Sequence, residues 1–234
     1  MKKSFVSNRE IALYALFVAA IAAGARFYIP VGGSEFTLQF LFANLAGLLL
    51  GKKGGAITLG IYLALGLIGV PVFAVGGGIA YVLRPSFGYL LGFLAGAYAA
   101  GYVLERQKSP TFKALLIAGL VNFLIVYVLG MTYNFLMTNL YVGDSLSVWT
   151  LVLYDFILQA PGDILLCFAG AWIAKQLLPI IKREAVGGGS MGASALTETK
   201  SRVADKEASF NSVNHEEPDS KPDTISDGME EEKR

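Results

Sequence analysis

The stretch Ala114–Met131, ALLIAGLVNFLIVYVLGM, decides the fold class of this chain. It carries no charged residue, and Asn122 is its only strongly polar side chain. A helix rises about 1.5 Å per residue, so roughly 20 apolar residues cross a hydrocarbon core of about 30 Å. The segment therefore predicts a transmembrane helix.

Five further apolar stretches lie on either side of this segment and have lengths near those of membrane spans. The six predicted spans are Ile11–Tyr28, Phe36–Leu50, Ala56–Val75, Tyr89–Leu104, Ala114–Met131 and Val148–Leu178. The last is long enough to contain a break at Pro161-Gly162. Hydrophobic residues make up 54% of the chain and the mean hydropathy is +0.55, which is typical of membrane proteins. We expect an all-α integral membrane protein with six transmembrane helices.

Basic residues are distributed unequally between the two sides that six spans would define. The outer side holds only Arg26 and Arg84. The inner side holds Lys2, Lys3, Arg9, Lys52, Lys53, Arg106, Lys108, Lys113, Lys175, Lys182 and Arg183. Because cytoplasmic loops carry an excess of Lys and Arg, this bias predicts that both termini are cytoplasmic.

The last 48 residues differ from the rest of the chain in composition. Residues 1–186 contain 13 Lys+Arg and 7 Asp+Glu, whereas residues 187–234 contain 6 and 11. The second segment begins GGGSMGASA and has Phe210 as its only aromatic side chain. Such a sequence cannot bury enough apolar area to offset the entropy of ordering it. We predict a six-helix membrane domain for substrate binding over 1–186 and a disordered, acidic cytoplasmic tail over 187–234.

Cysteine and histidine counts exclude several classes of chemistry. Cys167 is the only cysteine, and His215, in the tail, is the only histidine. A disulfide framework, a Ser-His-Asp triad and a His-based zinc site therefore cannot form. The run Gly51–Gly54 (GKKG) lacks the spacing of a nucleotide-hydrolysing loop. We expect a protein without catalytic residues, metal or cofactor, surrounded by membrane lipid and not bound to nucleic acid.

Polar residues near the outer ends of the predicted spans are the candidate ligand contacts: Gln39, Arg84, Tyr89 and Asp163. A charged side chain at membrane depth costs about 2.5–3.5 kcal/mol on insertion scales, so it needs a reason to be there. A few polar groups among aromatic side chains are what a small-molecule pocket requires. Other roles remain open: Arg84 as a headgroup anchor, Asp163 as a cap of backbone N–H groups, and Gln39 as a bond between helices. Asp155, nearer the surface, is interpreted as an interfacial residue.

Small residues recur every fourth position in the first predicted span, at Ala15, Ala19 and Ala23. Such stripes let helix backbones approach closely in lipid. The pattern alone fits packing within this chain and contact with another protein equally well.

Four segments in order resemble one transporter family. They are FTLQFLFANLAGLLLGKKGGA (36–56), YLALGLIGVPVFAVGGG (62–78), LRPSFGYLLGF (83–93) and APGDILLC (160–167). Together they resemble the BioY family, the biotin-binding S components of energy-coupling-factor (ECF) transporters. The likeness extends over roughly 29–174.

This resemblance implies a multi-pass subunit of the bacterial plasma membrane that binds biotin from outside. It also implies a transmembrane coupling subunit and two cytoplasmic ATPases as partners, with Ala15, Ala19 and Ala23 facing the coupling subunit. Biotin has a ureido ring, an apolar bicycle and a carboxylate. On side-chain chemistry, Gln39 and Asp163 suit the ureido group and Arg84 suits the carboxylate.

One position departs from the family pattern and leaves the ligand open. The family often has a lysine three residues after the aspartate of its PGD motif, whereas this chain has Leu166. Arg84 would then supply the positive charge for a ligand carboxylate. The alternatives are an S component for another vitamin, such as thiamine or riboflavin, and an autonomous carrier that uses Asp163 as a proton relay.

Overall fold

The computed structural model of the protein describes residues 7–31, 34–107, 110–143 and 147–181. The chain divides into two units, Met1–Lys182 and Arg183–Arg234, and all described residues belong to the first. The predicted disordered tail, 187–234, lies outside the described residues.

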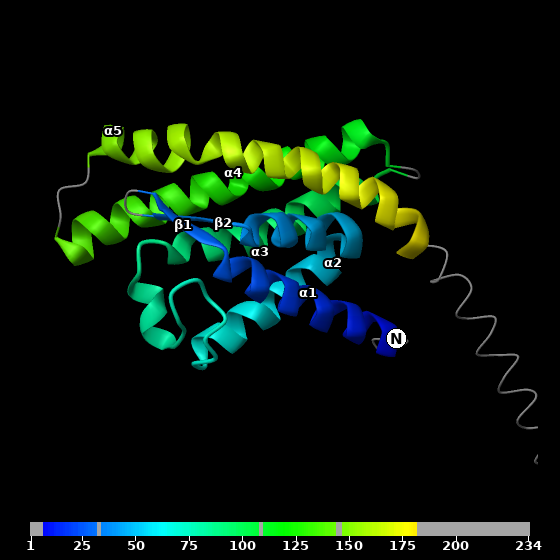
Figure 1. Ribbon diagram of the computed structural model, residues 1–234, viewed down its shortest axis with the longest axis horizontal. Helices are drawn as coiled ribbons and strands as arrows, with labels where there is room; N and C mark the ends of the chain where they lie inside the picture. Colours follow the sequence, from blue (N-terminus) through cyan, green and yellow to red (C-terminus); the bar gives the residue numbers. More distant parts are fainter. Residues whose placement is uncertain (1–6, 32–33, 108–109, 144–146, 182–234) are drawn as a thin grey trace, which may run out of the picture. The chain divides into compact units, whose positions relative to one another are not determined.

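The described part is mostly helical (Figure 1). Its helices are α1 (Asn8–Arg26), α2 (Gln39–Leu67), α3 (Phe87–Glu105), α4 (Phe112–Met137) and α5 (Val148–Leu151). The π-helical segment η2 (Thr138–Val142) extends α4, and η3 (Val152–Leu158) connects α5 to a final helix over residues 160–181. Five continuous helical stretches are long and apolar enough to cross a membrane: Asn8–Arg26, Gln39–Leu67, Phe87–Glu105, Phe112–Val142 and Val148–Ile181.

The helix α2 contains a reversal of chain direction at Gly51. This residue has φ 74° and ψ −178°, a conformation that glycine adopts at little steric cost. A Cβ atom placed on Gly55 would lie only 3.0 Å from the Cα atom of Gly47. Residues eight apart in a straight helix are separated by about 12 Å, so the two halves of α2 pack side by side instead. Figure 1 shows this turn back, which falls between the predicted stretches Phe36–Leu50 and Ala56–Val75.

A short hairpin separates α1 from α2 and differs from the sequence-based expectation. Strand β1 (Tyr28–Val31) pairs antiparallel with β2 (Ser34–Thr37), with Ile29 opposite Phe36. The sequence had predicted helix from Phe36 onward, which was wrong at this end. Hydropathy does not separate a short apolar strand from the first turn of a helix, because both are apolar.

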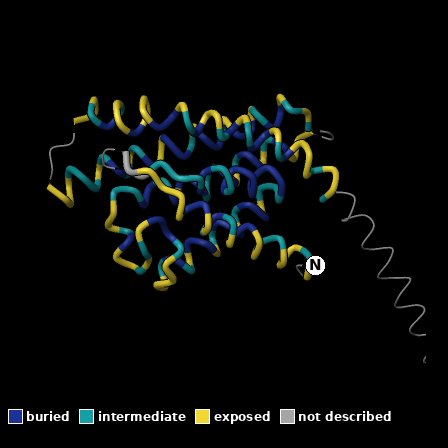
Figure 2. Tube along the Cα trace, viewed as in Figure 1, coloured by how far each residue is buried: buried dark blue, intermediate teal, exposed yellow. Residues whose placement is uncertain are grey.

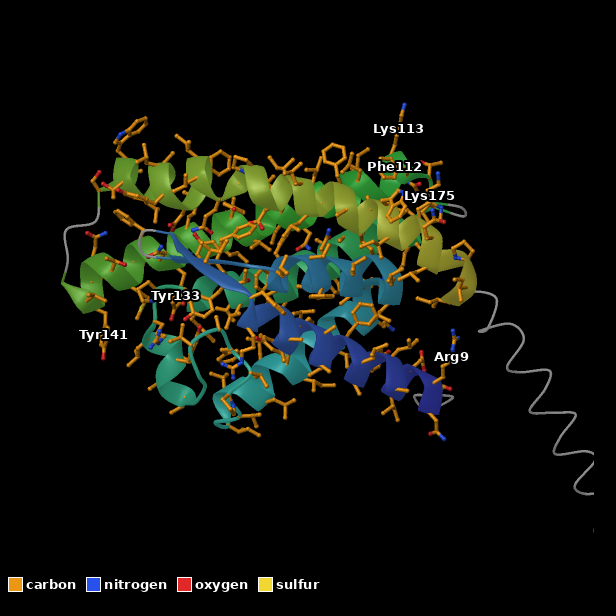
Figure 3. The ribbon with its side chains drawn as sticks, in the orientation of Figure 1. Arg9, Phe112, Lys113, Tyr133, Tyr141 and Lys175 are labelled. Carbon is orange, nitrogen blue, oxygen red and sulfur yellow. The ribbon has the colours of Figure 1, made fainter. Side chains whose placement is uncertain are left out.

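The helices α2, α3 and α4 form the centre of the described unit. The helix α3 packs against both α2 and α4, and Figure 2 shows the buried positions along the inner sides of these helices. At one end Arg9 donates to the Ile181 carbonyl (2.7 Å), and Lys52 pairs with Glu105 (2.7 Å). Figure 3 shows Arg9, Lys113 and Lys175 at this end, with Tyr133 and Tyr141 at the other. We call the first the basic end and the second the opposite end.

Candidate ligand-binding site

A cavity of about 50 Å³ lies towards the opposite end, where β2, η1 (Ile79–Leu83), the start of α3, the later half of α4 and the start of the final helix meet. Six of its fourteen lining residues are aromatic: Phe36, Phe40, Tyr81, Tyr89, Phe93 and Tyr127. Three of the four predicted ligand contacts, Gln39, Tyr89 and Asp163, also line it. Residues far apart in the sequence are therefore brought to one cavity, as a small-molecule site requires.

A second cavity of about 210 Å³ adjoins the first. It is lined by Ile29, Phe36, Leu158, Gln159 and Gly162. Two of these residues, Phe36 and Gln159, also line the first cavity, so they form the partition between the two. Drug-sized ligands occupy pockets of about 300–1,000 Å³, so a vitamin needs both spaces or a shift of this partition.

Asp163 is buried and points its carboxylate to a tyrosine on α4. The Tyr127 hydroxyl donates to Asp163 Oδ2 at 2.7 Å. A carboxylate has two oxygens and about four acceptor positions, so Asp163 can accept further hydrogen bonds from a ligand. The backbone N–H of Asp163 donates to the Gln159 carbonyl at 3.2 Å, which places this residue in a regular helical turn. The predicted break at Pro161-Gly162 lies earlier in the structure, at η3 and Gln159.

Two glutamine side chains line the same cavity, each with a buried Nε2 atom that has no partner in the described part of the chain. Gln39 is 2% exposed and Gln159 is 6% exposed. The Nε2 atom of each has no hydrogen-bond partner among the described residues. A buried donor left without a partner costs about 1–3 kcal/mol. A ligand with carbonyl acceptors would recover this free energy by accepting hydrogen bonds from the two Nε2 atoms, so the cavity suits a polar ligand.

Arg84 lies at the rim of the cavity and does not line it. It is exposed, and its guanidinium carbon is 5.4 Å from the ring centroid of Tyr81, a lining residue. The other predicted outer arginine, Arg26, donates to the Pro71 carbonyl at 2.5 Å. The described residues that line the cavity include no lysine or arginine, and the position of the family lysine is taken by partly buried Leu166.

Asp155 corrects one expectation from the sequence. It was interpreted as an interfacial residue, but it is 2% exposed. Its Oδ2 atom accepts hydrogen bonds from the Tyr89 hydroxyl (2.8 Å) and from Asn134 Nδ2 (2.6 Å). The sequence places Asp155 near the start of the last span, where hydropathy suggests a surface position. The π-helical geometry of η3, which places it among donors from α3 and α4, cannot be predicted from hydropathy.

The stripe on α1 faces away from the core. Ala15, Ala19 and Ala23 are all exposed, whereas Phe17 and Ile21 on the same helix are buried. Within the described residues the stripe therefore does not serve internal packing. It remains available for a contact with lipid or with another protein.

Two residues of the site had not been assigned from the sequence. Tyr127 lies in the apolar stretch that decided the fold class, and its signal is chemical: a buried tyrosine hydroxyl needs a partner. Gln159 precedes Asp163 by four residues, a spacing that places both side chains on one face of a helix. The cavity thus has two amide donors, Gln39 and Gln159, and one carboxylate acceptor, Asp163, among aromatic side chains. This set suits a neutral, ring-shaped group that has both N–H and C=O.

Comparison with known protein families matches residues 1–183 to the BioY family. A protein of Lysinibacillus sphaericus is 36% identical over 176 residues, which cover 75% of this chain and 90% of the relative. A Thermotoga maritima protein is 36% identical over 151 residues, covering 64% of this chain and 88% of the relative. The names of both contain the words "biotin transporter BioY".

Comparison with solved structures gives a similar result. The S component for biotin from an ECF-type ABC transporter superposes with a TM-score of 0.65 at 27% identity, over 74% of this chain and 94% of that one. FolT bound with folic acid superposes with a TM-score of 0.53 at 16% identity, over 74% of this chain and 98% of that one. The second likeness concerns the fold alone.

Proposed function

This chain belongs to the BioY family, and from that premise we propose that it captures biotin for uptake as the substrate-binding subunit of an ECF-type transporter. The family consists of transporter subunits and not of enzymes. The observation that supports biotin most directly is the cavity with two unpartnered buried amides, Gln39 and Gln159, beside the Asp163 carboxylate.

The chemistry of this cavity complements the ureido ring. The ureido carbonyl accepts hydrogen bonds, which the Nε2 atoms of Gln39 and Gln159 can donate. The ureido N–H groups donate, and Asp163 can accept from one or both of them. The apolar bicycle packs against the aromatic wall that includes Tyr89, and the carboxylate extends to Arg84 at the rim.

We infer six membrane spans with cytoplasmic termini. Six spans follow if each half of α2 crosses the membrane separately, an arrangement supported by the reversal at Gly51 and the close approach of Gly47 and Gly55. The basic end would then be cytoplasmic and the cavity would open outside, in the bacterial plasma membrane. This topology agrees with capture of a nutrient from the exterior.

The proposed energy source is a separate module with a transmembrane coupling subunit and two cytoplasmic ATPases. The exposed stripe of Ala15, Ala19 and Ala23 is the proposed contact for the coupling subunit. Its small side chains would let a partner helix approach the α1 backbone closely.

Isothermal titration of the purified full chain with biotin, thiamine and riboflavin tests the proposed ligand. We expect binding of biotin alone. The variants Gln39→Leu and Gln159→Leu should each weaken it by roughly tenfold, the effect of one lost hydrogen bond to a buried polar group. Gln176→Leu is the matched control, because Gln176 is exposed on the final helix and does not line the cavity. Preferential binding of another vitamin would refute the biotin assignment.

A further inference from the structure

Tyr89 lines the cavity, while its hydroxyl donates to a carboxylate outside the cavity. The hydroxyl donates to Asp155 Oδ2 at 2.8 Å, and Asn134 Nδ2 donates to the same oxygen at 2.6 Å. Asp155 and Asn134 are 2% and 3% exposed, and neither lines the cavity. A ligand in the cavity therefore contacts the ring of Tyr89, and the position of that ring depends on a carboxylate that the ligand does not reach.

The helix α4 confines the same ring from two more directions. A Cβ atom placed on Gly130 would overlap the Tyr89 ring, so the ring rests directly on the α4 backbone. The ring of Tyr127 stands nearly perpendicular to it, at 86° with 6.2 Å between centroids. Tyr127, Gly130 and Asn134 follow the spacing of one helical face, so a single face of α4 supports the Tyr89 ring and its carboxylate anchor.

Burial of the Asp155 carboxylate costs free energy, which suggests that the side chain has a specific role. Carboxylates buried at membrane depth are rare and are found where function or a specific partner requires them. Asp155 also lies in η3, and π-helical segments inside helices occur frequently at functional sites. Packing of η3 alone does not require a carboxylate, since an apolar residue would fill the same space without the desolvation penalty.

We propose that Asp155 is a positioning residue for vitamin recognition: it holds the Tyr89 hydroxyl so that the Tyr89 ring forms a fixed wall of the ligand cavity. The inference rests on the proposed function, because it concerns the same cavity and the same ligand. Asp155 acts through Tyr89, and Asn134 keeps the accepting oxygen of Asp155 in place.

A double-mutant cycle with biotin as the probe tests this dependence. Asp155→Leu removes the acceptor and Tyr89→Phe removes the donor, and each should weaken biotin binding by roughly tenfold, as for the loss of one positioned aromatic contact. The double variant should be no weaker than the weaker single variant, because both changes release the same ring. Asp155→Asn should bind nearly as the wild type does, since an amide oxygen still accepts the hydroxyl.

The cycle also separates positioning from a general structural role. Losses that add in the double variant would show that Asp155 acts independently of Tyr89, which would overturn the proposal. So would Asp155→Leu that binds biotin as tightly as the wild type, or Asp155→Asn that binds as weakly as Asp155→Leu. Wild-type protein that binds no biotin would refute the proposed function, and this inference with it.

A substitution on α4 provides a second test that leaves the hydrogen bond intact. Gly130→Ala adds a methyl group against the Tyr89 ring and should push the ring into the cavity, so that biotin binds at least tenfold more weakly. Gly60→Ala is the matched control, because a Cβ atom at Gly60 meets no atom within 4 Å. A folded Gly130→Ala variant with wild-type affinity would refute the role of the ring.

Discussion

The proposed contact between the ligand carboxylate and Arg84 predicts how much ligand affinity the Arg84→Ala variant should lose. Arg84 is a basic residue beside the cavity wall, with its guanidinium carbon 5.4 Å from the ring centroid of the lining residue Tyr81. A charge-assisted hydrogen bond contributes about 1.5–3 kcal/mol when it is buried, whereas exposed ion pairs contribute about 0.2–1 kcal/mol. Arg84 is exposed, so a value between these two ranges applies to its contact with a ligand. We therefore expect a loss of about 1 to 1.5 kcal/mol for Arg84→Ala, or roughly five- to tenfold in affinity.

The assay compares biotin with its neutral carboxamide on the wild type and on Arg84→Ala by isothermal titration. The amide should bind the wild type more weakly than the acid, because it lacks the charge that Arg84 recognises. It should lose little further affinity in the variant. Arg26→Ala is the control, since Arg26 also lies on the proposed outer side but donates to the Pro71 carbonyl.

Two results would refute this reasoning. If folded Arg84→Ala bound the acid as tightly as the wild type, the carboxylate would be recognised elsewhere. If Arg84→Ala weakened acid and amide equally, Arg84 would support the fold of the rim around Tyr81 instead of the charge of the ligand. Thermal stability measurements in detergent accompany each titration, so that an unfolded variant is not mistaken for one that fails to bind.

Three further predictions concern the rest of the chain. Ala19→Trp should abolish uptake by the complete transporter while leaving biotin affinity unchanged, because Ala19 is exposed on α1 and lines neither cavity; reduced affinity would contradict the docking role. In a background without cysteine, a cysteine at Ser86 should be labelled from outside and one at Ser194 only from the cytoplasm, and labelling of both from one side would refute six spans. Asn122→Leu should lower thermal stability by about 1–3 kcal/mol, because Asn122 Nδ2 donates to buried Asn44 Oδ1 at 3.0 Å; an unchanged melting temperature would contradict this.

Hydropathy predicted the long helices, whereas the orientation inferred from charge stays a prediction. The long apolar stretches became helices because a hydrocarbon core requires backbone hydrogen bonds to be satisfied within each segment. The positions of Gln39, Tyr89 and Asp163 at one cavity were predictable because spans of known length and alternating direction place their ends on known sides. Neither argument needs knowledge of tertiary contacts, because both rest on the length and hydropathy of each span.

Hydropathy and span length did not predict the features that depend on local backbone geometry or on packing between helices. Only the outer ends of the β1–β2 hairpin, Tyr28 and Phe36–Thr37, were assigned to helices, since they continue the neighbouring hydrophobic runs, and the pairing between the strands was not predicted. Asp155 was placed at the surface because hydropathy does not register π-helical geometry or donors from other helices. The bond between Tyr127 and Asp163 joins residues 36 positions apart, so no local pattern contains it.

The proposed site recognises the ring and the carboxylate of the ligand with different residues, which would make the family lysine unnecessary in this chain. Leu166 follows Asp163 by three residues and packs partly buried against the core, so the inner part of the cavity has no cation among its described lining residues. A ligand carboxylate placed there would be desolvated beside the Asp163 carboxylate with no cation to offset its charge, at a cost that a neutral hydrogen bond does not repay. In the proposed binding mode the same carboxylate lies near water and near exposed Arg84, while the neutral ring enters the amide-lined interior. In this binding mode the interior selects the ring by its hydrogen bonds and Arg84 selects the charge, so that no lysine or arginine is needed among the described residues that line the cavity.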